Sequence, residues 1–413
     1  MNPLAHMDEE QRRPVLFVGY WELADGLTAS SIMPGVRLML DDFQVPRVIL
    51  ATVERSGAAG PSPIAGMVKA LHLPWHELRI GPKVMARTLD HLGRVRQLVR
   101  AIREHRVGVV FARTAPAAVA ALAAARITRV PLVVESFEPH ADYMADCGEW
   151  SRRGALYKLV RRQEQRVLDK SRFLITVAHS YRDRLLGQGV DPDRVLVAPC
   201  PVDMQQFTID TVARTRIRTD LALGDTFTGV YAGKFGGLYH DHLAFQTFKH
   251  MHDRLNGRFK LIVLTPDPPE RVKEGLNKAG FPIEDAWVSR VPHEAVPHYL
   301  NAADMAFALY KRTPSSAYLS PVKIGEYWAC GLPVLLTRGV ADDGGIIEHE
   351  GIGGALFDPE GDDLGPAIER ILQLAATVDD RVRHRKLAER YRSIGHTRAA
   401  YDRVFTALGN MSM

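Results

Sequence analysis

Short runs of apolar residues recur along this chain, and they constrain its fold more than any other feature. The first half contains six, which begin at Val15, Arg47, Val107, Pro131, Phe173 and Arg194. The second half contains six more, which begin at Thr228, Lys260, Ala286, Met305, Pro333 and Gly354. A strand that is apolar on both faces belongs in a parallel sheet that helices cover on both sides. Two parallel sheets are therefore predicted.

Helical patterns fill the gaps between these runs, for example over residues 90–104, 117–126 and 241–255. Strands that alternate with helices are typical of doubly wound α/β domains. A chain of 413 residues is also too long for one ordinary core. The architecture predicted is two Rossmann-like domains, with a ligand in the crevice between them at the carboxyl ends of the strands.

The predicted domains cover residues 1–203 and 204–385. They join near A-P-C-P-V-D-M-Q-Q-F, residues 198–207, where two prolines and an aspartate follow a buried strand and no periodic pattern continues. Residues 386–413 are helical and charged, with no strand after them. We expect this last segment to pack back across the first domain.

The composition is that of a globular protein, with 46% hydrophobic and 24% charged residues. No apolar run is long enough to span a membrane, and the first residues lack the apolar core of a signal peptide. A cytoplasmic location is expected. The three cysteines form no C-x-x-C pair, which argues against a disulfide framework or a structural zinc site.

Positive charge is concentrated in the first half. Residues 1–200 carry 28 Lys+Arg and 21 Asp+Glu, a net charge of +7, whereas the remaining residues carry 25 and 27, a net charge of −2. Much of the excess lies in residues 152–168, where basic residues flank an apolar helical stripe. The pattern is typical of a solvated helix face. The alternative is peripheral contact with an anionic membrane surface or a lipid-linked phosphate, and nucleic acid is not expected because no nucleic-acid motif occurs.

One segment, S-P-V-K-I-G-E-Y-W-A-C-G-L-P-V-L-L-T at residues 320–337, predicts an anion-binding helix followed by a buried strand. Ser320 is expected to cap the helix and Pro321 to occupy its first position, which leaves free backbone N–H groups for a phosphate. Lys323 and Glu326 lie three residues apart and share one face of the helix. They would place a cation beside a diphosphate and a carboxylate beside sugar hydroxyls.

Two other classes of site are disfavoured. The D-x-D pair that a metal-dependent sugar transferase needs at a strand end occurs only at Asp191 and Asp193, within a turn. The sequence G-Y-W-E-L-A-D-G after the first strand lacks the G-x-G-x-x-G of a nicotinamide site. No metal and no other cofactor is expected.

Several motifs together resemble the GT-B glycosyltransferases, specifically glycosyltransferase family 4. V-A-P-C-P-V-D-M-Q-Q-F is similar to the interdomain element of that family, and V-Y-A-G-K-F at residues 230–235 is similar to the strand and loop that open its donor domain. The sequence V-P-H-E-A-V-P-H-Y-L-N-A-A-D at residues 291–304 resembles the segment beside the nucleotide base. The segment at residues 320–334 and E-S-F-E-P-H-A-D-Y-M-A-D-C-G-E-W at residues 135–150 resemble a subgroup found in bacterial surface-polysaccharide pathways.

This resemblance implies a GT-B fold and a set of donor-binding residues. Glu326 would bind the donor ribose, Lys234 would neutralise the diphosphate, and N–H groups around Val322 and Lys323 would hold its oxygens. The chain departs from the family at two positions, since Tyr318 replaces a glutamate and a histidine stands near the second member of an Arg…Lys pair. The donor-binding set is Gly233, Lys234, His240, Arg290, Val291, Tyr318, Ser320, Pro321, Val322, Lys323 and Glu326.

The activity implied is transfer of a sugar from a nucleoside-diphosphate sugar to a glycan, a lipid-linked molecule or another hydroxyl acceptor, with retention of anomeric configuration. Catalytic candidates are Lys234, Glu326, Glu138 and His140, of which His140 could act as a base on the acceptor hydroxyl. Two alternatives remain open. One is a nucleotide-sugar epimerase of the same fold, and the other is a non-catalytic nucleotide-binding relative that acts as a partner protein.

Overall fold

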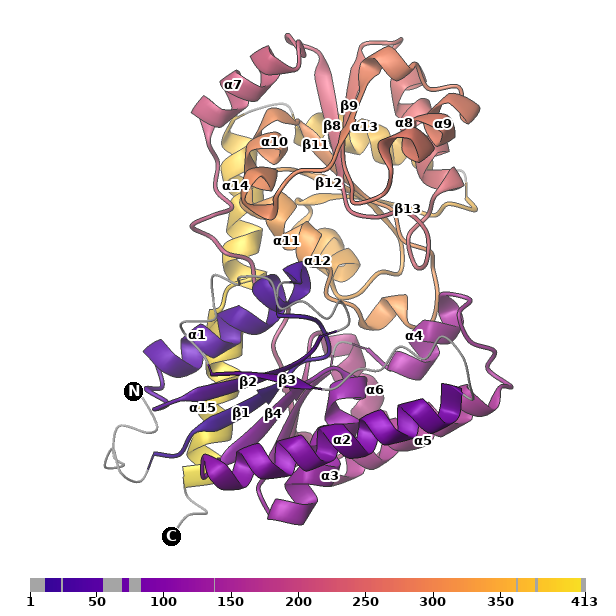
Figure 1. The fold of residues 1–413 in the computed structure, drawn as a ribbon. Coiled ribbons are helices and arrows are strands. Elements are labelled where there is room, and N and C mark those ends of the chain that lie inside the picture. The colour runs from indigo at the N-terminus through magenta and orange to yellow at the C-terminus, as the bar shows by residue number, and fades with distance from the viewer. Residues whose placement is uncertain are drawn as a thin grey trace. The chain divides into compact units, whose positions relative to one another are not determined.

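The computed structural model describes residues 12–23, 25–54, 69–73, 83–136, 138–361, 363–375 and 378–409. The chain forms two compact units (Figure 1). Unit 1 comprises residues 1–145, 150–199 and 394–413, and unit 2 comprises residues 146–149 and 200–393. The chain passes from unit 1 to unit 2 between Pro199 and Cys200, inside the segment where the prolines and aspartate predict a junction.

Unit 1 is built on a parallel sheet of seven strands in the order β3-β2-β1-β4-β5-β6-β7. Its strands are β1 (Val15–Val18), β2 (Val48–Val53), β3 (Lys69–Leu73), β4 (Val109–Arg113), β5 (Leu132–Ser136), β6 (Phe173–Thr176) and β7 (Val195–Val197). Six of them are the predicted apolar runs. Strand β3 was not predicted, because lysine and histidine interrupt its sequence K-A-L-H-L and it pairs only along the edge of the sheet.

Helices cover both faces of this sheet (Figure 1). They are α1 (Met33–Asp41), α2 (Lys83–Glu104), α3 (Ala115–Thr128), α4 (His140–Asp146), α5 (Ala155–Lys170), α6 (His179–Gly187) and α15 (Gly395–Gly409). Helices α1 and α15 share one core with the sheet, and α3 packs on β1, β4 and β5 between α2 and α5. As predicted, the C-terminal helix belongs to unit 1, but the segment that returns begins at Ile394 and not at residue 386, because α14 continues to Tyr391 within unit 2. Its Tyr401 hydroxyl donates a hydrogen bond to the buried Glu135 carboxylate at 2.5 Å.

Unit 2 contains a parallel sheet of six strands in the order β10-β9-β8-β11-β12-β13. The strands are β8 (Phe227–Ala232), β9 (Phe259–Leu264), β10 (Ala286–Ser289), β11 (Met305–Ala308), β12 (Val334–Thr337) and β13 (Gly354–Phe357), and each matches a predicted run. The helices are α7 (Thr211–Asp220), α8 (His242–Arg254), α9 (Pro269–Lys278), α10 (Val296–Ala302), α11 (Val322–Ala329), α12 (Asp343–Glu350), α13 (Leu364–Leu374) and α14 (Val378–Tyr391).

The strand order reverses once in each sheet, between β1 and β4 in unit 1 and between β8 and β11 in unit 2. Loops on the two sides of such a switch point leave the sheet in opposite directions and open a crevice at the carboxyl ends of the strands. Each unit therefore has one preferred ligand position, and in unit 2 it lies beside the loops that follow β8 and β11.

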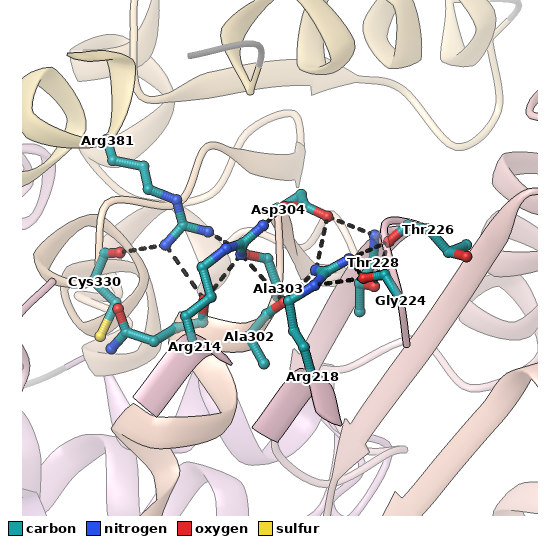
Figure 2. A network of polar contacts seen from close by, with 11 residues as sticks. Arg214, Arg218, Gly224, Thr226, Thr228, Ala302, Ala303, Asp304, Cys330 and Arg381 are labelled. Atoms are coloured by element: carbon teal, nitrogen blue, oxygen red, sulfur yellow. Dashed lines mark hydrogen bonds and ion pairs between the residues drawn. The ribbon is translucent and has the colours of Figure 1, made fainter. Parts of the chain in front are cut away.

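Arginines from α7 and α14 hold the loop that leads into β11 (Figure 2). Arg214 and Arg218 both pair with the carboxylate of Asp304 and both donate to the carbonyl of Ala302. Arg381 donates to the carbonyl of Ala303, and burial lowers its pKa to about 10. Guanidinium groups are suited to this task because one group can satisfy several carbonyls at the end of a helix. The network fixes β11 and the switch point beside it.

Candidate donor site and candidate acceptor residues

The helix α11 begins at Val322, one residue later than the sequence predicts. Pro321 is its N-cap, with an extended ψ of 114°, and no side chain caps the helix. The Ser320 hydroxyl is engaged elsewhere, since it accepts a hydrogen bond from the Cys200 N–H at 3.0 Å and another from the buried Arg392 guanidinium. The predicted cap by Ser320 and the predicted helical position of Pro321 are therefore wrong. The N–H groups of Val322 and Lys323 still lie in the first turn, where the helix itself provides no acceptor.

Lys323 is buried among aromatic rings instead of extending into solvent. Its Nζ lies 4.2 Å from the ring centre of Tyr239, 5.0 Å from that of Tyr231 and 5.5 Å from that of Tyr310. These three tyrosines, here called the tyrosine cage, hold an ammonium group that has no hydrogen-bond partner among the described residues. Burial lowers the pKa of Lys323 to about 7. An uncompensated buried cation of this kind would be stabilised by an anion placed beside it.

Gly233 leaves the space that Lys323 occupies. It follows β8 with a φ of 139°, and a Cβ atom at this position would lie 2.5 Å from the Lys323 Nζ. Any side chain here would therefore strain the backbone and collide with the ammonium group. Glycine in this loop permits close approach of the helix α11 lysine to the end of β8.

Glu326 has a partner that the sequence analysis missed. Its carboxylate is 3.1 Å from the His293 Nε2, and the residue is 8% exposed. The hydrogen bond to Glu326 raises the pKa of His293, whose ring also packs on Phe207 at a centroid distance of 5.5 Å. His293 lies in the motif V-P-H-E directly after the strand β10 and its loop. The histidine in this motif is visible in the sequence, but it is 33 positions away from Glu326, so the sequence did not predict the contact.

The loop after β8 carries two further candidates. Lys234 is exposed, and its backbone carbonyl accepts a hydrogen bond from the Tyr231 hydroxyl at 2.6 Å. His240 is held by its N–H, which donates to the Leu309 carbonyl at 3.0 Å, while its buried Nε2 has no partner among the described residues. Burial lowers the pKa of His240. The loop therefore offers one exposed cation and one neutral imidazole next to the switch point.

The remaining donor candidates lie around the same edge of the unit 2 sheet. Arg290 is exposed and Val291 is half-buried directly after β10, while Tyr318 is half-buried in the single 3₁₀ turn Ser316–Tyr318 before α11. Carboxyl ends of parallel strands share one edge, so the loops after β8 and β10 and the start of α11 lie on the same side of the sheet. We call this set of loops the donor edge.

The candidates Glu138 and His140 belong to unit 1. Burial, with the nearby Glu164 carboxylate, raises the pKa of Glu138 to about 8, and burial alone lowers the pKa of His140 to about 4. Glu164 accepts hydrogen bonds from the N–H groups of His140 at 2.6 Å and Ala141 at 3.2 Å, which caps the start of α4. At neutral pH Glu138 is then largely protonated and His140 is uncharged. Neither group is a strong base.

No three His, Cys, Asp or Glu side chains in the described part of the chain are grouped so as to hold a metal ion. Among the helices that the structure describes, none has the length and apolar character required to cross a membrane.

Residues 39–201 match the model of a family described as Glycosyl transferase 4-like domain. No curated protein matches the sequence at a significant level. Solved structures match it over nearly the whole chain. The chain has the GT-B fold.

Three solved structures illustrate this likeness of fold. Sucrose-phosphate synthase from Thermosynechococcus elongatus has a TM-score of 0.72 at 14% identity, with 97% of this chain and 100% of that chain covered. Anabaena Alr3699/HepE in complex with UDP has a TM-score of 0.68 at 13% identity over the same shares. WaaG, a glycosyltransferase involved in lipopolysaccharide biosynthesis, has a TM-score of 0.67 at 14% identity, with 95% and 99% covered. At such identities the likeness establishes the fold alone, and the family model covers less than half of the chain.

Proposed function

We propose that this chain is a glycosyltransferase, which transfers a sugar from a nucleoside-diphosphate sugar bound at the donor edge to a hydroxyl group of a glycan or lipid-linked acceptor. The observation that carries the proposal is Lys323. Its ammonium group is buried, lacks an anionic partner and lies at the start of α11, next to the end of β8. A diphosphate in this place would receive a cation and two N–H groups together.

In the proposed reaction, the bond between the anomeric carbon and the phosphate oxygen breaks and leaves its electron pair on the nucleoside diphosphate. The acceptor oxygen forms the new bond to the anomeric carbon and loses its proton to the departing diphosphate. Negative charge grows on the departing diphosphate, so donors already oriented toward it lower the barrier. We assign this role to Lys323, the N–H groups of Val322 and Lys323, and the exposed Lys234.

Glu326 is assigned to the donor ribose. Its carboxylate already accepts one hydrogen bond from His293 and retains acceptor capacity for hydroxyl groups. His293 would then hold the carboxylate in place while the ribose binds. Arg290 and Val291 are assigned to the border of the base, and His240, Gly233 and Tyr318 to the sugar and diphosphate side of the donor edge.

The acceptor is proposed to bind at the switch point of unit 1, at the carboxyl ends of β1 and β4. Thr114, directly after β4, has a φ of 74° and a ψ of 155°, which is a strained conformation for a β-branched residue. Strain of this kind is concentrated at functional sites. We assign His140 and Glu138 to orienting the acceptor hydroxyl by hydrogen bonds. At neutral pH Glu138 is largely protonated and His140 is uncharged, so neither is suited to remove a proton from the acceptor. Retention of anomeric configuration and independence from metal ions are part of the proposal.

Peripheral contact with a membrane is proposed for helix α5 of unit 1. Leu156 and Leu159 on this helix are exposed, at 37% and 54%, among arginines and lysines. A helix with apolar and basic side chains together on its surface favours an anionic membrane surface, where a lipid-linked acceptor would be found.

The first test is a thermal-shift comparison of UDP, GDP, ADP, CMP and dTDP, each with and without magnesium, because a ligand that binds only the folded state raises Tm. UDP is the leading candidate, because the similar Anabaena structure is a complex with UDP. A shift with one nucleoside diphosphate that is independent of magnesium supports the proposal. A shift without turnover on any acceptor would support the non-catalytic alternative, and a change of sugar configuration without an acceptor would support an epimerase.

A further inference from the structure

Unit 1 contains a group of basic side chains at the edge of its sheet opposite to the switch point. A cavity of about 310 Å³ opens where α3 and α5 end and where β5 and β6 begin. Its lining includes five cationic side chains and one serine: Arg126, Arg129, Lys170, Arg172, Arg194 and Ser171. We call it the basic pocket. It lies at the amino ends of the strands, one strand length of roughly 15 Å from the carboxyl ends where the acceptor is proposed to bind.

Cations near the carboxyl ends of helices are common, because they interact favourably with the helix dipole. Arg194 acts in this way, since its Nη2 donates to the carbonyls of Leu168 at 2.8 Å and Ser171 at 2.6 Å. The other four cationic side chains of the basic pocket are not needed for this interaction with helix ends. Arg126, Arg129 and Lys170 are exposed and form no ion pair among the described residues, and no acidic residue lines the cavity. Their charges therefore repel one another without internal compensation.

Ser171 supplies an independent sign of a ligand. It is 3% exposed, it lines the basic pocket, and its Oγ has no hydrogen-bond partner among the described residues. Buried hydroxyl groups are almost always hydrogen-bonded, because leaving one without a partner is destabilising. A hydroxyl without a partner in the wall of a cationic cavity remains free to donate a hydrogen bond to an anion.

We infer that the basic pocket binds a phosphate-bearing anion with at least two negative charges, through Arg126, Arg129, Lys170 and the hydroxyl of Ser171. Phosphate oxygens accept hydrogen bonds from guanidinium, ammonium and hydroxyl groups alike, which matches the donors present. The cavity volume is at the lower end of the range for small-molecule sites. The anion is either a small soluble molecule, such as an oligophosphate or a phosphorylated sugar, or the headgroup of an anionic lipid.

The soluble source is tested by titrating the full chain with pyrophosphate at about 150 mM salt, where the Debye length is only about 8 Å and diffuse attraction is small. The pocket variant Arg126→Gln/Arg129→Gln/Lys170→Gln is expected to bind pyrophosphate at least tenfold more weakly than the unmodified chain. A matched control, Arg96→Gln/Arg100→Gln/Arg103→Gln, removes three exposed charges from α2 and is expected to remain within twofold. Lys323→Met is titrated beside them, so that binding at the donor edge is recognised.

A milder variant, Ser171→Ala, distinguishes a loss of anion binding from a loss of stability. Removing a hydroxyl that lacks a partner is expected to leave the free chain at least as stable in Tm, yet to weaken pyrophosphate binding about fivefold, because a charge-assisted hydrogen bond is lost.

The lipid source is tested by sedimentation with vesicles of phosphatidylglycerol and phosphatidylcholine, and with vesicles of phosphatidylcholine alone. Loss of binding to the anionic vesicles in the pocket variant, with binding retained in the α2 control, supports a lipid headgroup as the anion. If the pocket variant and the control bind pyrophosphate equally, and also bind the anionic vesicles equally, the inference is overturned.

Discussion

Lys323 shows how a single buried side chain connects the fold with the proposed chemistry. The tyrosine cage surrounds its ammonium group, and the nearest carboxylate, that of Glu326, is hydrogen-bonded to His293. The pKa of Lys323 is lowered to about 7 because burial disfavours the charged form. A diphosphate beside it would favour that charged form and raise the pKa again.

Nucleoside diphosphate binding is therefore expected to take up a proton between about pH 7 and pH 9. The free protein holds Lys323 largely neutral in this range, whereas the complex holds it charged, so affinity should fall as pH rises. Calorimetric titrations in buffers of different ionisation enthalpy measure this uptake. In the Lys323→Met variant the uptake should disappear and affinity should fall at least tenfold. Equal proton uptake by both proteins would remove Lys323 from the donor site.

Gly233 leads to a prediction with a matched control. Gly233→Ala introduces a Cβ atom 2.5 Å from the Lys323 Nζ at a φ of 139° and is expected to reduce both stability and nucleotide binding. Gly236 has a φ of 84°, and an added Cβ atom would meet no atom within 4 Å. Gly236→Ala should therefore cost only the backbone strain, about 1–2 kcal/mol. Thermal unfolding and nucleotide titration of both variants distinguish the effect of the collision with Lys323 from the effect of backbone strain. Equal loss of nucleotide binding in the two variants would contradict the role of Gly233.

At the level of elements, the donor edge depends on contacts between loops and helix starts. The loop after β10 supplies His293, and α11 supplies Glu326. Tyr239 and Tyr310 form an isolated antiparallel bridge that joins the loop after β8 to the end of β11. Helix α11 is therefore connected to three different strand ends, and none of these contacts is local in the sequence.

The His293–Glu326 contact predicts a specific pH dependence. The pKa of His293 is raised above its unfolded value, so its stabilising contribution is full below the unfolded pKa of about 6.5 and is lost as pH rises through the higher folded pKa. The difference in Tm between the unmodified chain and His293→Gln should be largest near pH 5.5 and small at pH 8.5. Because His293 is 46% exposed, the difference will be modest. A difference that grows with pH would refute the assignment.

Considered as a whole molecule, the chain uses its last helix to complete a domain that it began at the other end. Helix α15 lies in the core of unit 1, where Tyr401 and Phe405 contact the rings of Phe43 and Phe111. Glu135 at the end of β5 receives hydrogen bonds from Tyr401 and from Arg113 at the end of β4. Stability of unit 1 therefore depends on residues almost 400 positions away from its first strand.

Tyr401→Phe is expected to destabilise unit 1 by about 1–3 kcal/mol, because it removes a donor from a buried carboxylate. The control is Tyr299→Phe in unit 2, whose hydroxyl forms no hydrogen bond among the described residues and whose ring stacks on Trp287. Calorimetric unfolding should show a lower transition for the Tyr401 variant and little change for the control. Equal transitions in both variants would show that Glu135 does not need Tyr401.

The sequence alone predicted twelve of the described strands, because each is a short run of mostly apolar residues in a parallel sheet. Strand β3 carries lysine and histidine at an edge, so it lacked that signal. Tertiary structure decided the rest. Arg392 and Cys200 bind the Ser320 hydroxyl, which was expected to cap the helix, and His293 contacts Glu326. Tyrosines from β8, from the loop after it and from the end of β11 surround Lys323. Periodicity follows from neighbours along the chain, whereas these contacts join segments that only the folded sheet brings together.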